Sequence, residues 1–151
     1  MKTLAIILLF LIAAPPAAGS DLAASVRHLA ENVLGAGTVT SLTVTDRGAT
    51  VLLRWESATF RTNQRVDALK DGLVAEAQLA TGSILGRLHT VSRIKFSIMR
   101  AAAMLAAGEN NRSGGLKLTF AASLGGGTYA PAAAAPPAPS KPAGGTSSAK
   151  D

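Results

Sequence analysis

The side chains that could perform acid-base or metal chemistry are few. The only two histidines, His28 and His89, are far apart in the sequence, and His28 stands three residues before Glu31, a helical spacing. Such a pair offers two ligands, whereas a catalytic zinc site usually takes three from the protein. We therefore expect a solvated helix face at His28 and no metal site.

Activated nucleophiles and phosphate loops are also not indicated. No Gly-x-Ser-x-Gly pattern, the strand-to-helix context that activates a serine in many hydrolases, occurs in the chain. The segment Gly82–Gly86 lacks the lysine of a phosphate loop. Glu56 and Glu76 would become paired carboxylates only by accident of folding. We expect no catalytic residue and no cofactor, with a small hydrolase of unrecognised site as an alternative.

The remaining candidates for a functional role are basic side chains. Outward positions of three predicted strands hold Arg54, Arg93, Lys95 and Lys117. Guanidinium and ammonium groups gathered on one surface bind phosphates or carboxylates better than scattered ones do. These four residues are our candidate ligand-binding set. Outward positions of an exposed sheet are polar in any case, so simple solubility is the alternative interpretation.

Two helices and two pairs of strands would position these residues. Apolar residues at helical intervals predict a first helix from Asp21 to Leu34, and the stripe from Val66 to Leu88 predicts a longer second one. Thr62 or Asn63 is the expected N-cap of the second helix, and the glycines near Gly82 favour a kink in it.

Alternation of apolar and polar residues predicts the strands. The segments 38–45 and 50–56, joined by a turn at Asp46–Gly48, form a hairpin. A third strand spans 91–100 and a fourth 116–120, hairpinned to each other across a polar turn at 108–115. The stretch 101–107 either continues the third strand or forms a short helix.

The expected fold is therefore α+β. It is a two-layer sandwich of order αββαββ, in which an antiparallel or mixed sheet of three or four strands has both helices on one face. The core-facing positions of the sheet are Leu42, Val44, Val51, Leu53, Ile94, Phe96, Leu118 and Phe120.

The N-terminus has the order of a secretory signal peptide: Lys2, an apolar run from Leu4 to Ala14, then small residues. The run is shorter than the roughly 20 residues that a spanning helix needs. We expect residues 1–19 to be removed before Ser20, which leaves no transmembrane segment and an exported protein, periplasmic or secreted. The alanine-rich composition favours a bacterial source.

The mature chain divides into a single α+β domain, 20–124, and a disordered Ala/Pro/Gly-rich tail, 125–151. The protein lacks cysteine and carries a net charge of +6. A basic exported domain attracts anionic lipid, wall polymer or an acidic envelope protein. We expect no nucleic-acid partner, because an exported protein seldom meets nucleic acid and the chain has only one Trp, one Tyr and four Phe for base stacking. The oligomeric state is not predicted.

The helix, hairpin, helix, strand order resembles the BON domain of exported and periplasmic proteins. The likeness covers residues 21–99. It includes the strand, glycine turn, strand segment 43–53 and the entry to the next strand at 91–94. Arg54 and Trp55 depart from it, where that family often carries a glycine, and the second helix is longer. The sequence resembles GerM-type domains to the same degree, through their strand, strand, helix, strand core. The BON resemblance implies attachment to phospholipid or the envelope and no catalysis.

These observations favour an exported, non-enzymatic binding or adaptor domain that recognises an anionic partner through a basic sheet face. A structural subunit of a secreted or envelope assembly is the alternative, with Trp55 or the stretch 101–107 as its contact surface.

Overall fold

The computed structural model describes residues 18–131. Most of the predicted signal peptide, residues 1–17, and the predicted tail from residue 132 onward lie outside the described residues. The helices are α1 (Ala18–Leu34) and α2 (Val66–Arg87). The strands are β1 (Val39–Thr45), β2 (Thr50–Glu56), β3 (Arg93–Arg100), β4 (Ala103–Asn111), β5 (Gly115–Phe120) and β6 (Thr128–Tyr129).

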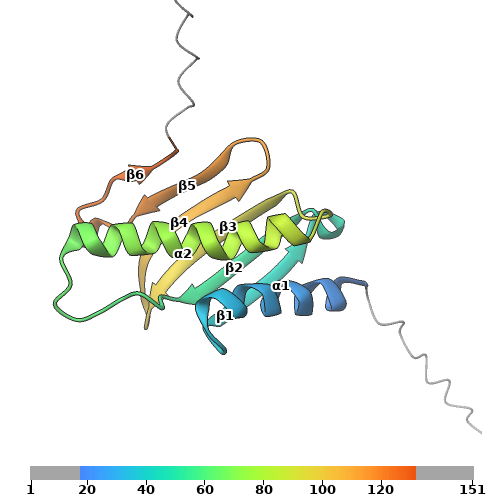
Figure 1. Cartoon of the computed structure of the whole chain (residues 1–151), viewed down its shortest axis with the longest axis horizontal. Coiled ribbons are helices and arrows are strands. Elements are labelled where there is room, and N and C mark those ends of the chain that lie inside the picture. The colour runs from blue at the N-terminus through green and yellow to red at the C-terminus, as the bar shows by residue number, and fades with distance from the viewer. Residues whose placement is uncertain (1–17, 132–151) are drawn as a thin grey trace, which may run out of the picture.

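All six strands form one sheet in sequence order, β1 to β6. The pairing of β2 with β3 is parallel and the other four pairings are antiparallel. A parallel pair needs a crossover, which α2 supplies. Figure 1 shows α2 running across the sheet, with α1 beside it near β1. The α+β class and the position of both helices on one face are as expected, and the sheet is mixed.

The number and order of the strands were predicted incorrectly. The sheet has six strands rather than three or four, and the elements follow the order αββαββββ. The third predicted strand turns at Ala101, whose φ of 51° is left-handed, and returns as β4. The predicted polar turn at 108–115 is therefore wrong in its first half, since residues 108–111 belong to β4. Strand β5 pairs with β4, not with β3.

The core lies between the helices and the sheet. Six of the expected core positions, Val51, Leu53, Ile94, Phe96, Leu118 and Phe120, are buried, and Leu42 and Val44 are partly buried against them. Trp55 is fully buried, and its ring centroid lies 5.3 Å from that of Phe96. The long helix α2 continues through Gly82 without a break, and its N-cap is Arg65.

A buried carboxylate joins α2 to the end of β2. Glu76 is 4% exposed, and its carboxylate accepts hydrogen bonds from Trp55 Nε1 at 3.0 Å, Ser57 Oγ at 2.8 Å and the Thr59 backbone N–H. The Ser57 N–H donates to the Met99 carbonyl oxygen at 2.9 Å, which adds β3 to the same cluster. Both oxygens of this buried carboxylate therefore accept hydrogen bonds, which offsets the cost of removing the group from water.

Two further polar contacts hold the layers together. Asn110 of β4 donates from Nδ2 to Thr81 Oγ1 of α2 at 2.8 Å, and both residues are buried. Arg112, in the turn after β4, donates to the carbonyl oxygens of Leu85, Leu88 and Val91 around the C-terminal end of α2. A cation at this end satisfies unpaired carbonyls and favours the helix dipole.

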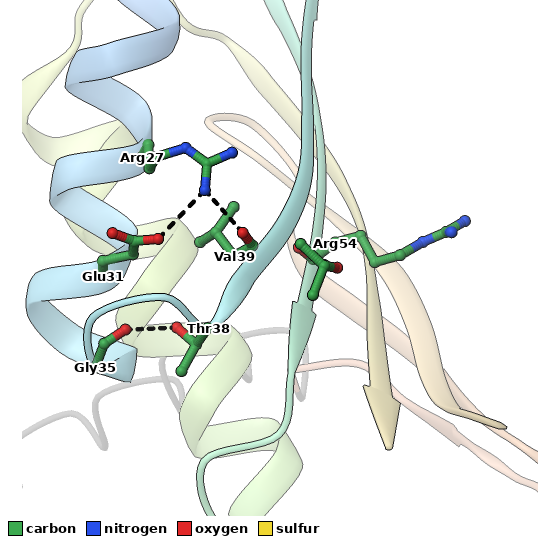
Figure 2. A network of polar contacts seen from close by, with 7 residues as sticks. Arg27, Glu31, Gly35, Thr38, Val39 and Arg54 are labelled. Atoms are coloured by element: carbon green, nitrogen blue, oxygen red, sulfur yellow. Dashed lines mark hydrogen bonds and ion pairs between the residues drawn. The ribbon is translucent and has the colours of Figure 1, made fainter. Parts of the chain in front are cut away.

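Helix α1 is tied to the edge of the sheet by Arg27. Its guanidinium Nη1 donates to the Val39 carbonyl oxygen at 2.8 Å and lies 3.3 Å from Glu31 Oε1 (Figure 2). The apolar side of α1 begins at Leu22, and Val26 and Ala30 are fully buried. The residues that hold α1 in place therefore follow the predicted cleavage site.

Strand β6 falls within the stretch 125–131, where we expected the tail to begin. It pairs with β5 through Thr128 and Tyr129. Lys70 of α2 holds the loop before it: its Nζ donates to the Gly126 carbonyl oxygen at 2.8 Å and lies 5.1 Å from the centre of the Phe120 ring. The chain therefore stays paired with the sheet as far as Tyr129. Within residues 18–131, neither helix combines the length and the apolar character that a membrane span requires.

The Glu76 cluster can be tested by an isosteric change. In Glu76→Gln, one amide N–H must face a donor from Trp55, Ser57 or Thr59, so we expect the free energy of unfolding to fall by about 2 kcal/mol. Urea unfolding followed by Trp55 fluorescence measures this difference. The matched control is Asp71→Asn, an exposed carboxylate on the same helix, which should change stability by less than about 0.5 kcal/mol. Equal stability of Glu76→Gln and the unchanged protein would contradict this role.

Candidate functional site

The face of the sheet opposite the helices carries the predicted basic residues. Arg54, Arg93, Lys95 and Lys117 are all exposed there. The strand residues that are buried in the core with α1 and α2 occupy the alternate positions, on the other face. Figure 2 shows the Arg54 side chain pointing away from α1, on the other side of the sheet. We call this surface the open face.

Strand register arranges the open face in cross-strand rows. In one row, Lys95 of β3 pairs with Glu109 of β4, which pairs with Lys117 of β5. In the next, Arg54 of β2 pairs with Ser97 of β3. Neighbouring strands are about 4.8 Å apart, so Lys95 and Lys117 extend from positions about 10 Å apart with Glu109 midway.

One hollow on the open face, called the larger hollow below, has a volume of about 450 Å³ and lies over β3, β4 and β5. The charged residues that line it are those of the first row, Lys95, Glu109 and Lys117. Its other polar lining comes from Thr119, Thr128 and Tyr129, and its floor includes Gly108. The volume falls within the range of about 300–1,000 Å³ that small-molecule sites occupy.

The smaller hollow, of about 250 Å³, lies over β1, β2 and β3. Arg54 and Lys95 supply its positive charge, and Ser41, Thr43 and Ser97 supply hydroxyl groups. Leu52, which is 41% exposed, gives it an apolar wall. Lys95 lines both hollows and therefore stands between them.

The structure brings three of the four predicted residues into the hollows. Lys95 and Lys117 share the larger one, and Lys95 and Arg54 share the smaller one. Arg93 belongs to the neighbouring row, opposite Thr50 and Asn111, and lines neither hollow. It contributes positive charge to the open face but not to either hollow.

Sequence reasoning missed Glu109, which stands in the centre of the larger hollow. The residue was assigned to a polar turn, because the Ala-Gly-Glu-Asn-Asn segment has few residues that favour strands. Thr128 and Tyr129 were missed because they follow three glycines and precede the proline-rich stretch. No local signal marks β4, the strand of Glu109, because Ala106, Gly108 and Asn110 on one face and Ala107, Glu109 and Asn111 on the other do not alternate apolar with polar.

Gly108, which lines the larger hollow, lies close against the backbone of β5. A Cβ atom at this position would lie 2.1 Å from the Lys117 carbonyl oxygen and 3.0 Å from the Leu118 Cα atom. Both obstacles are backbone atoms, which cannot move aside as a flexible side chain would. Strands β4 and β5 therefore approach each other at a distance that only glycine allows.

The residues considered for catalysis have separate structural partners. His28 is exposed on α1 and lies 3.2 Å from Asn32 Nδ2, whereas Glu31 pairs with Arg27. Glu56 accepts a hydrogen bond from the Ala101 N–H, and Glu76 lies in its own buried cluster. Across residues 18–131, no group of three or more histidine, aspartate or glutamate side chains is arranged to hold a metal ion.

Comparisons with protein-family models, with curated proteins and with solved structures gave no match. The BON and GerM resemblances therefore stay predictions.

The close approach at Gly108 predicts a clear mutational effect. We expect Gly108→Ala to lower the free energy of unfolding by at least about 2 kcal/mol, because the added methyl group overlaps backbone atoms. Chemical denaturation measures this change. The matched control is Gly82→Ala on α2, where nothing lies within 4 Å of the added atom and stability should rise by about 1 kcal/mol. A Gly108→Ala protein as stable as the unchanged one would show that the strands are not constrained there.

Proposed function

We propose that this chain is an exported, non-catalytic binding or adaptor domain of the cell envelope that recognises anionic groups through its open face. The observation that carries the proposal is the position of Arg54, Arg93, Lys95 and Lys117, exposed together on one sheet face that the helices leave uncovered.

The cations of the open face are available for a ligand. Throughout the described part of the chain, the one ion pair within 4.0 Å joins Arg27 to Glu31, on the helical side. Lys95 and Lys117 therefore keep their ammonium donors free of carboxylate partners. Exposed cations attract anionic lipid or wall polymer and raise the rate of encounter. This attraction is screened over about 8 Å at physiological ionic strength, so binding should weaken as salt rises.

The structural-subunit alternative loses one of its two proposed contact surfaces. Trp55 is fully buried beneath α2 and bonded to Glu76, so it cannot contact a partner. In the predicted stretch 101–107, residues 101–104 are exposed, and Met104 is 49% exposed. This stretch carries no charged residue, whereas the open face carries four exposed cations and the hollows between them.

Sedimentation with vesicles of anionic phospholipid, and separately with wall sacculi, tests the binding proposal. We expect Arg93→Ser combined with Lys95→Ser to reduce the affinity about thirtyfold, since each basic residue near an anionic surface contributes about 1 kcal/mol. Vesicles of neutral lipid should not sediment the protein. If the protein sediments with only the anionic vesicles or only the sacculi, that material carries the groups that the protein recognises.

The control removes the same charge from the helical side. Arg65→Ser combined with Arg87→Ser changes two exposed residues of the α2 region and should leave sedimentation nearly unchanged. If the two double variants lose affinity equally, net charge rather than the open face governs binding and the proposal fails. It fails equally if neither variant loses affinity.

Export has its own test. In a bacterial host we expect the mature protein to begin at Ser20, as mass spectrometry of the exported fraction would show. Ala17→Arg should block cleavage, because the peptidase accepts small residues at this position. Ala23→Arg, beyond the cleavage site, is the control and should leave processing unchanged. Retention of the full-length chain inside the cell would contradict the assignment of residues 1–19.

A further inference from the structure

The order of charges in the larger hollow excludes more ligands than the positive charge of the open face as a whole does. Across β3, β4 and β5 the row reads positive, negative, positive, from Lys95 through Glu109 to Lys117. Only the two outer members suit an anion. The central carboxylate repels a ligand that presents a continuous negative surface.

Glu109 is available to a ligand. It is half-buried, whereas the lysines beside it are exposed. Its Oε1 atom receives a single long contact, 3.4 Å from Asn111 Nδ2. No lysine lies within 4.0 Å of its carboxylate oxygens in the part of the chain that the structure describes. A carboxylate with spare acceptor capacity, at the centre of a hollow, favours a donor or a cation in the ligand.

We propose that the larger hollow binds a zwitterionic ligand in which an amine stands between two carboxylates, the chemistry of amino-dicarboxylic acids, which include the acidic amino acids. The outer carboxylates face Lys95 and Lys117, and the ammonium group faces Glu109. This inference rests on the proposed function, because it uses two lysines of the basic open face. Within the larger hollow it narrows the general attraction to anions to recognition of alternating charge.

A matched pair of small molecules tests the pattern. In 4-aminoheptanedioate an amine lies midway between two terminal carboxylates, and heptanedioate differs only in lacking that amine. We expect the unchanged protein to bind 4-aminoheptanedioate about tenfold more tightly, since one charge-assisted hydrogen bond is gained. Calorimetric titration gives both affinities, and amide chemical shifts of β4 and β5 locate the bound molecule.

The variant Glu109→Gln assigns the preference to one residue. It keeps the shape of the side chain but removes its charge, so the tenfold preference should disappear. Binding of heptanedioate should stay equal or become tighter, because repulsion is relieved. The control Asp71→Asn, which removes a carboxylate from α2, should keep the preference.

Three results would overturn the inference: no binding of either molecule, equal affinities for the unchanged protein, or a preference that survives Glu109→Gln. The single variant Arg93→Ser distinguishes failure of the zwitterion inference from failure of the proposed function. Arg93 lines neither hollow, so its loss should weaken sedimentation with anionic vesicles or sacculi and leave the preference for the amine intact. Sedimentation that depends on the open face, without that preference, would overturn only the zwitterion inference.

Discussion

The buried carboxylate of Glu76 is the contact on which the arrangement of the other elements depends. It gathers Trp55 at the end of β2, Ser57 and Thr59 in the connection that follows, and α2 itself. Since α2 is the crossover between β2 and β3, its position determines how these parallel strands align. A slip of one residue would exchange the two faces of a strand. The same register thus buries Ile94 and Phe96 and exposes Arg93 and Lys95.

Strongly periodic segments could be predicted from the sequence, and weakly patterned ones could not. The long apolar stripes of both helices and the Thr/Val alternation of β1 indicated their elements correctly. Strand β4 was missed because Ala106 and Gly108 have little strand preference by themselves. Contact with α2 and β5 makes them part of a sheet, and such contacts are not visible in a local pattern. The two-residue strand β6 pairs with β5, and the loop before it is held by Lys70, a residue distant in the sequence.

The candidate site was predicted in part for the same reason. Lys95 and Lys117 lie on strands with clear alternation, so their outward direction could be read from the sequence. Their neighbourhood depends on the strand between them, and missing β4 hid Glu109 and made the open face look uniformly basic. Arg93 was grouped with Lys95 because they alternate on one strand, yet only Lys95 lines a hollow. Spacing along one strand shows which face a residue occupies, whereas register between strands shows which residues it meets.

The anchoring of β6 connects the two layers of the molecule. Thr128, Tyr129 and Ala130 form part of the wall of the larger hollow, and Lys70 of α2 anchors the loop that leads to them. One side of the hollow is therefore fixed by a residue of the helical layer. The shape of the hollow is thus coupled to the packing of α2, although no residue of that helix lines it.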